Sequence, residues 1–179
     1  ASSAASDVYK RQEKEEMRVK RIEKVDKNCR RNKMFPVYEQ KKENVHILQK
    51  TSRHAPPHLH NSVEFIYVIS GSMEIGMGQE LFHMDEGDFA VIFPDVIHHY
   101  QVFSEKTSRA DYILVPSSFA GVFKDKIQGY APKYPVIRAG QIEPDVYNAI
   151  QAIIQMEENE PMIVQAYVQI VPVSYTHLR

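Results

Sequence analysis

The sequence has a single cysteine, Cys29, among its 179 residues. One cysteine excludes a framework of disulfides within the chain and suits a protein that folds in a reducing compartment. The sequence also lacks any apolar run near the roughly 18 residues that a membrane-spanning helix needs. No hydrophobic segment of a secretory signal stands near its start. We therefore expect a cytoplasmic protein with no membrane partner.

The sequence also lacks an excess of charge of either sign. The formal net charge is −1, from 22 basic and 23 acidic side chains, so no overall field draws the molecule to nucleic acid. The composition, 43% apolar and 25% charged, is that of an ordinary globular protein. The length is enough for one hydrophobic core with a small appendage.

Both ends of the chain resemble translated vector or adapter sequence. The first residues read A-S-S-A-A-S-D-V-Y-K, and the last read V-S-Y-T-H-L-R. We interpret residues 1–16 as a non-native leader and residues 172–179 as a non-native tail, and exclude both from the fold argument. The protein's own sequence is then expected to begin near Met17 and to continue past Val171. His177 is expected to have no function.

Residues 17–42 form a basic arm. Between residues 17 and 33, eight lysine and arginine side chains face only two acidic ones. One interpretation is an arm that contacts nucleic acid. The other is a solvated arm or short helix whose few apolar residues touch the core. We favour the second, because the run has no interleaved aromatic residues.

From residue 34 to residue 115 the sequence predicts short β-strands separated by turns. Apolar, β-branched and aromatic runs bounded by glycine, proline, asparagine or aspartate are typical of strands. Several short strands at regular spacing favour a β-sandwich or barrel. The expected strands span residues 34–38, 45–49, 58–70, 72–77, 80–84, 89–93, 98–103 and 109–115.

After Pro116 the spacing of the apolar residues changes. Residues 117–140 predict an irregular or short helical connection, and helices are expected to follow Pro144 and Pro161. Two such helices after a β-domain must cover it as a lid or pair with a second subunit. Their expected apolar faces are Val146, Ala149, Ile150, Ile153 and Ile154 in the first helix, and Ile163, Ala166, Tyr167 and Ile170 in the second.

Two histidines and a carboxylate occur close together in the stretch H-L-H-N-S-V-E-F-I-Y-V-I-S-G, residues 58–71. Successive side chains of a strand point to opposite faces, so His58, His60 and Glu64 share one face if this stretch is extended. Their convergence predicts either a metal site or a polar patch in a ligand pocket. Apart from Glu64, residues 63–69 are β-branched or aromatic at both parities, which predicts a strand buried on both faces.

The motif H-x-H-x3-E-x6-G at residues 58–71 resembles the first motif of the cupin superfamily, and G-D-x5-P-x3-H at residues 87–98 resembles the second. Order and spacing both agree. The resemblance implies a mainly β fold, a cupin double-stranded β-helix (jelly-roll) barrel over residues 43–116, followed by a pair of α-helices within residues 117–171. The second motif departs from the family pattern, with Asp95 where glycine is usual and Val102 where asparagine is usual.

The resemblance also implies a ligand set. Neutral imidazoles and a carboxylate suit a divalent transition metal such as Zn, Ni, Fe or Mn. The alternative is that the same residues line a pocket through hydrogen bonds, without a metal. The implied metal ligands are His58, His60, Glu64 and His98. The expected ligand-binding residues are these four together with Phe93 and Tyr100.

Two phrases, V-E-F-I-Y-V-I-S-G-S-M and G-D-F-A-V-I-F-P-D-V-I-H, are typical of a narrower group. With the arm before them and the helices after them, they resemble the N-terminal sugar-binding and dimerisation domain of AraC-family transcriptional regulators. The resemblance implies an effector-sensing domain, not an enzyme. It implies a small-molecule effector, for example a sugar, in the barrel and a homodimer through the C-terminal helices. DNA would be bound only by a C-terminal helix-turn-helix domain absent from this chain.

Two other functions stay open on the sequence. A stand-alone metal-dependent cupin enzyme, of dioxygenase or isomerase type, needs an open coordination position and a general acid or base. Near the second motif only Asp95 offers such a group. A storage cupin of the seed type is disfavoured by the single short barrel. The reading frame downstream of residue 171 distinguishes regulator from enzyme, because paired helix-turn-helix motifs favour the first and a stop codon the second.

Overall fold

The structure, a computed structural model, describes the chain in five segments. The leader at residues 1–16 and most of the basic arm lie outside the described residues. The described segments are residues 36–39, 44–103, 107–128, 131–156 and 160–177, with side chains described as far as residue 171.

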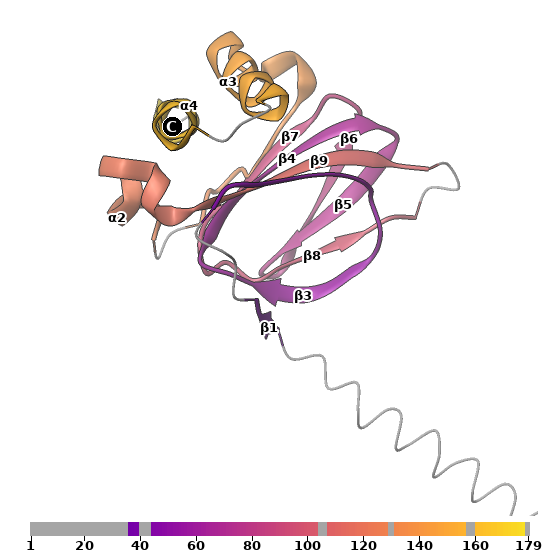
Figure 1. Cartoon of the computed structure of the whole chain (residues 1–179). Helices are drawn as coiled ribbons and strands as arrows, with labels where there is room; N and C mark the ends of the chain where they lie inside the picture. Colours follow the sequence, from indigo (N-terminus) through magenta and orange to yellow (C-terminus); the bar gives the residue numbers. More distant parts are fainter. Residues whose placement is uncertain (1–35, 40–43, 104–106, 129–130, 157–159, 178–179) are drawn as a thin grey trace, which may run out of the picture. The chain divides into compact units, whose positions relative to one another are not determined.

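The described residues contain ten strands in two sheets that face each other (Figure 1). The strands are β1 Val37–Tyr38, β2 His46–Thr51, β3 Ala55–Leu59, β4 Ser62–Ser70, β5 Ser72–Met77, β6 Glu80–Asp85, β7 Phe89–Ile92, β8 His98–Gln101, β9 Arg109–Pro116 and β10 Val136–Ile137. The first sheet has the order β1-β3-β8-β5-β6, and the second has the order β10-β7-β4-β9-β2. The predicted jelly-roll barrel is confirmed.

β4 lies in the middle of the second sheet and is buried on both faces, as predicted. Val63 and Phe65 enter the apolar cluster beneath the helices, whereas Ile66 and Val68 enter the cluster between the two sheets. Apolar residues at both parities permit this, because each face of the strand has an apolar layer to enter. Glu64 has the parity of Ile66 and therefore points between the sheets.

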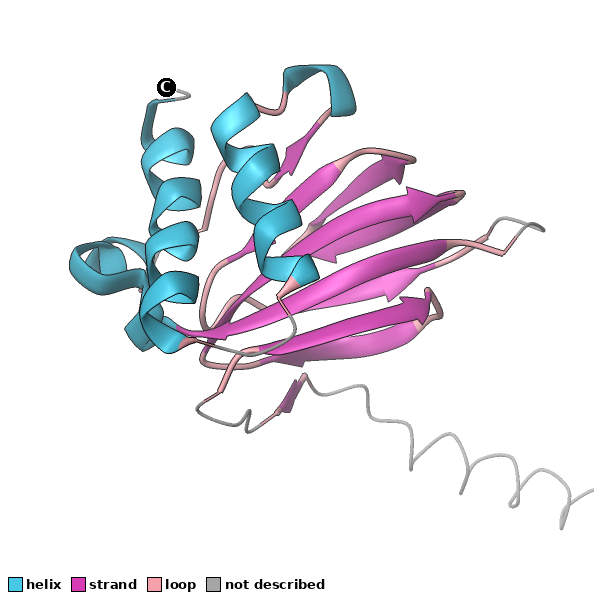
Figure 2. Cartoon of the chain, turned by 45° about the horizontal axis from the view of Figure 1, so that its top comes forward, coloured by secondary structure: helices cyan, strands magenta, loops and turns pink. Residues whose placement is uncertain are grey.

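The helices cover the outer face of the second sheet (Figure 2). They are η1 Ser117–Phe123, α2 Lys124–Ile127, η2 Ala139–Gln141, α3 Pro144–Gln155 and α4 Pro161–His177. Pro144 begins α3, where its missing N–H costs no hydrogen bond. None of the helices in the described part of the chain has the length and apolar content needed to cross a bilayer. The buried residues of α3 confirm the predicted face: Val146, Ala149, Ile150 and Ile153.

The buried face of α4 agrees with the predicted one only in part: Tyr167 and Ile170 pack against the core. Val164 and Val168 are fully buried, whereas the predicted Ile163 is 42% exposed and Ala166 is also exposed. Residues 161–171 of α4 are apolar almost all round, so the pattern does not select one face. The contacts of α4 with α3 and η1 select it instead.

The predicted strand from His58 to residue 70 is in fact two strands. β3 ends at Leu59 in the first sheet, and β4 begins at Ser62 in the second. The two prolines of β3 lie where its pairing with β8 is irregular, which is where a strand tolerates proline. β10 is a further strand that the sequence does not predict, because two residues are too short to show a period.

Asp88 of the second motif fastens the connection after β10 to the turn before β7. Its carboxylate accepts hydrogen bonds from the main-chain N–H groups of Asp85 and Ala139, and from the Arg138 guanidinium at 2.6 Å. The side chain is buried, so these bonds satisfy a charge that would otherwise be costly to remove from water. This motif residue therefore has a structural role.

Candidate metal and ligand site

The four predicted metal ligands lie together between the two sheets. His58 and His98 are a register pair of the antiparallel strands β3 and β8, Glu64 reaches across from β4, and His60 comes from the β3–β4 connection. One ligand atom of each side chain lies within 4.8 Å of the others. All four residues are buried. The structure thus brings the four residues together, but His58, His60 and Glu64 come from two sheets and their connection rather than from one face of a single strand.

Each imidazole is oriented by a hydrogen bond from its Nδ1 to a main-chain carbonyl oxygen two residues away. A carbonyl oxygen only accepts, so Nδ1 carries a proton, and Nε2 of each neutral ring is a free lone pair. The Nδ1–H donor and its acceptor are separated by 2.8 Å from His58 to Pro56, 2.9 Å from His98 to Val96 and 3.1 Å from His60 to Ser62.

The Nε2 lone pairs converge on Glu64. Nε2 of His60 lies 3.0 Å, and Nε2 of His98 3.3 Å, from the same carboxylate oxygen of Glu64. Lone pairs and an anionic oxygen repel at these distances unless a proton or a cation lies among them. Imidazoles whose second nitrogen is hydrogen-bonded, together with a carboxylate, are typical of a metal site. The residues therefore fit a divalent transition metal ion.

The charge states of the cluster also suit metal binding. Burial alone raises the pKa of the Glu64 carboxyl, but His60 and His98, whose protonated rings can donate to it, outweigh burial and hold that pKa well below its usual range, so a metal ion would take the place of these protons. Burial, together with the nearby His98, lowers the pKa of His58. An anionic carboxylate and neutral imidazoles are the forms that bind a metal.

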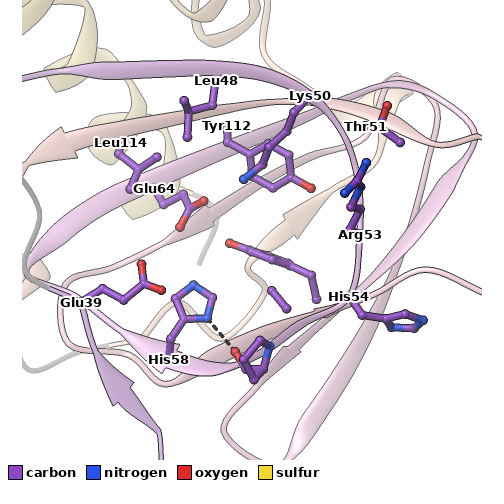
Figure 3. A pocket seen from close by; sticks show the side chains of 13 residues that line it. Glu39, Leu48, Lys50, Thr51, Arg53, His54, His58, Glu64, Tyr112 and Leu114 are labelled. Atoms are coloured by element: carbon purple, nitrogen blue, oxygen red, sulfur yellow. Dashed lines mark hydrogen bonds between the residues drawn. The ribbon is translucent and has the colours of Figure 1, made fainter.

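A cavity of about 440 Å³ lies beside the cluster (Figure 3). Its volume is within the roughly 300–1,000 Å³ of small-molecule sites. His58 and Glu64 line it where it meets the cluster, and Tyr112 and Leu114 form part of its wall. The predicted ligands therefore line a space that a small molecule can enter.

Tyr100 lies between the cluster and this cavity. Its ring centroid is 5.8 Å from that of His58 and 5.7 Å from that of His98. Tyr100 lines the cavity, is 5% exposed, and its hydroxyl has no hydrogen-bond partner among the described residues. Burial and the nearby Glu64 charge raise its pKa well above the usual value, so the hydroxyl keeps its proton. This predicted residue therefore offers an unused donor to a ligand.

Phe93, the other aromatic residue predicted to bind ligand, lies elsewhere. It follows β7 with the parity of Phe89 and Val91, and it packs in the cluster beneath the helices. It does not line the cavity beside the metal ligands. Parity along β7 therefore separates Phe93 from the site.

Asp95 stands where the cupin motif usually has glycine, and the turn is formed nevertheless. Its φ is 63°, the left-handed region that glycine enters freely and that aspartate tolerates better than most residues. Its main-chain N–H donates to the carbonyl oxygen of His60 at 2.8 Å. The turn between β7 and β8 thereby holds the connection that carries His60.

Two basic residues of the cavity were not predicted from the sequence. Lys50 is in β2 and Arg53 follows it, and both are exposed side chains that line the cavity. Basic residues in an exposed strand have no distinguishing pattern, and no motif includes them. Only the pairing of β2 with β9 places them near the cluster.

The comparisons with known proteins agree with this fold. The sequence profile of the family described as "Cupin domain" matches residues 44–115. No curated protein matches the sequence. An RmlC-like cupin family protein from Methanocaldococcus jannaschii is 22% identical, with a TM-score of 0.38 over 42% of this chain and 72% of its own. The match of the family profile alone identifies residues 44–115 as a cupin domain.

ToxT from Vibrio cholerae resembles a longer part of the chain. The structure of ToxT with an unsaturated fatty acid bound has a TM-score of 0.51 and 9% identity, over 75% of this chain and 53% of ToxT. A second ToxT crystal form gives a TM-score of 0.49 and 12% identity, over 75% and 55%. This chain thus spans about half the length of ToxT, and the shared fold extends beyond the barrel.

Proposed function

We propose that this chain is the effector-sensing and dimerisation part of an AraC-type transcriptional regulator. In this proposal the cupin barrel binds a divalent transition metal and a small-molecule effector. The observation that carries it is the cavity whose wall includes His58 and Glu64 of the buried cluster. A cavity lined by apolar walls and a few convergent polar groups is the usual form of a small-molecule site. The two strand phrases typical of AraC-type sensors supply the class of regulator.

The metal would be held by His58, His60, Glu64 and His98. When bound, it would supply a Lewis-acidic contact for an oxygen of the effector. The chain's own contribution is orientation, because main-chain carbonyl groups fix all three imidazoles before any ion arrives. Tyr100 adds a hydrogen-bond donor at the border between the ion and the cavity.

The two faces of β4 connect the cavity to the helices. Glu64 points to the cluster, and its neighbour Phe65 packs on the other face, in the cluster that includes Val146 of α3 and Val164 of α4. An effector that binds two arrangements of the helices with different affinity shifts their populations. ToxT, whose shared fold extends beyond the barrel, was solved with an unsaturated fatty acid bound, which supports a small-molecule site on this architecture.

Metal content tests the ligand assignment. We expect the purified chain to retain stoichiometric metal by elemental mass spectrometry, and the double variant His58→Ala, His60→Ala to lose it. His83→Ala is the matched control, because this histidine lies on the exposed side of β6 outside the cluster. Circular dichroism establishes that the double variant is folded. Stoichiometric metal in the folded double variant contradicts the assignment.

The gene itself tests the regulatory assignment. We expect the genomic reading frame downstream of residue 171 to encode paired helix-turn-helix motifs. A stop codon there contradicts the regulator and favours the stand-alone enzyme.

One observation favours a metal-dependent cupin enzyme as the second candidate. The hydroxyl of Tyr100 lies beside the cluster and keeps its proton, so it can donate a hydrogen bond that stabilises charge developing on a bound substrate. Asp95, the acid near the second motif, is exposed and holds a turn instead. An enzyme converts its bound ligand at a rate that falls in Tyr100→Phe, whereas a sensor releases the ligand unchanged.

A further inference from the structure

The charges around the cavity are separated in space. Lys50 and Arg53 lie on one side, and Glu39 lies with His58 on the other (Figure 3). Among the described residues, neither Lys50 nor Arg53 forms an ion pair. The basic side of the cavity is therefore free to receive an anionic group.

The balance of charge also favours an anion. The side chains that line the cavity include two cations, Lys50 and Arg53, and two carboxylates, Glu39 and Glu64. These formal charges cancel, so a divalent ion at the cluster leaves an excess of two positive charges. An acid with a second polar group offsets that excess at both sides of the cavity.

Aromatic rings connect the two sides. The ammonium of Lys50 lies 4.4 Å from the ring centroid of Tyr112, the centroids of Tyr112 and Tyr100 are 5.5 Å apart, and Tyr100 then contacts His58. Tyr112 donates its hydroxyl proton to Ser52 at 3.0 Å, and its ring, only 1% exposed, forms part of the cavity wall. Tyr100 keeps an unpartnered hydroxyl, as described above. A flat ligand fits this wall because aromatic rings pack with favourable geometry against one another.

We propose that the effector is a compact aromatic hydroxy-acid. Its carboxylate pairs with Lys50 and Arg53, its ring lies along the two tyrosines, and its hydroxyl reaches Tyr100 and the metal cluster. This inference rests on the proposed function and names the ligand class of that site. A neutral sugar leaves both cations unpaired, and a fatty acid places its alkyl chain against charged groups at the cluster.

The first test compares two probes that differ only in charge. 4-Hydroxybenzoate and its amide, 4-hydroxybenzamide, are titrated calorimetrically into the zinc-loaded chain and into chelator-treated chain. We expect the acid to bind at least about tenfold more tightly than the amide, because charge-assisted hydrogen bonds are roughly twice as strong as neutral ones. Equal affinities overturn the proposal, as does the absence of binding by both 4-hydroxybenzoate and 3-hydroxybenzoate.

Single substitutions test which residues cause the preference for the acid over the amide. Lys50→Gln and Arg53→Gln are each expected to weaken binding of the acid about tenfold more than binding of the amide. Tyr100→Phe is expected to weaken both probes by the same factor, since it removes a bond to the hydroxyl that they share. Lys124→Gln, at an exposed position of α2, is the control and changes neither. An acid preference that survives both Lys50→Gln and Arg53→Gln overturns the proposal.

These outcomes are distinct from failure of the proposed function. If D-galactose or hexadecenoate binds in the cavity and neither hydroxybenzoate does, the ligand class is wrong while the sensing site stands. If the reading frame ends without helix-turn-helix motifs, the regulator is wrong, whatever the probes show.

Discussion

Main-chain carbonyl groups, rather than side chains, hold Nδ1 of His58, His60 and His98. Each acceptor is only two residues from its histidine, so the orientation of the ring is part of the local backbone path. Outer partners of metal-bound histidines fix the ring orientation and commonly determine metal affinity. Here no single side-chain substitution removes them, because the acceptors belong to the backbone.

His83 differs from these three histidines because both of its ring nitrogens face carboxylate oxygens. Its Nδ1 lies 2.6 Å from a carboxylate oxygen of Glu74 and its Nε2 lies 3.0 Å from one of Asp85. The hydrogen bond to Glu74 raises the pKa of His83, against a smaller lowering by burial. A histidine whose folded pKa is raised stabilises the fold below its unfolded pKa of about 6.5, and this stabilisation is lost as the pH rises through the folded pKa.

We therefore expect His83→Gln to lower the free energy of unfolding more at pH 5.5 than at pH 8.5. The difference should be below about 1 kcal/mol, because the pair is exposed and screened by solvent. Urea titrations at the two pH values measure it. Glu74→Gln alone and with His83→Gln complete a double-mutant cycle, whose coupling should shrink at the higher pH. A coupling that does not change with pH contradicts the ion pair.

The sequence predicts those features of strands and helices that depend on residues close together along the chain. β4 was identified with the correct parity for Glu64, and the motif residues came together because their spacing encodes the turns between β3, β4, β7 and β8. Lys50 and Arg53 could not be predicted, since their place at the cavity depends on β2 pairing with β9 more than fifty residues away. The break between β3 and β4 was missed because His58, His60 and Glu64 share parity, which a single strand through Asn61 and Ser62 would explain equally well. The buried face of α4 could not be predicted in full, because packing against α3 and η1 determines it.

Matched truncations test which face of α4 is buried. Val168→Ala removes two buried carbons and is expected to lower the free energy of unfolding by about 2 kcal/mol, from lost transfer energy and the space left behind. Ile163→Ala should cost less than about 1 kcal/mol, because that side chain is partly exposed already. Both changes raise helix propensity, so packing accounts for the difference. Chemical denaturation with equal losses for both variants contradicts the assigned face.

At the scale of the whole molecule, the helical side leaves apolar side chains uncovered. Met162 is 84% exposed and Ile163 is 42% exposed at the start of α4, and Val122 of η1 is 82% exposed. Exposed apolar patches commonly mark an interaction surface, and η1 and α4 pack against each other. The resemblance to AraC-type sensors implies a homodimer through these helices, and we propose that a second copy of the chain covers the start of α4.

Ile163→Asp tests this interface without harming the fold. The substitution places a carboxylate in the first turn of α4, where the helix dipole favours negative charge, while a charge at an apolar interface is strongly unfavourable. Sedimentation equilibrium is expected to show a dimer for the original chain and a monomer for the variant. Leu81→Asp, on an exposed position of β6 in the other sheet, should remain dimeric. Glu64 faces the cavity and Phe65, on the opposite face of β4, packs beneath the helices. Effector binding should therefore also change the dissociation constant of the dimer. A variant at residue 163 with the mass of the original dimer places the interface elsewhere.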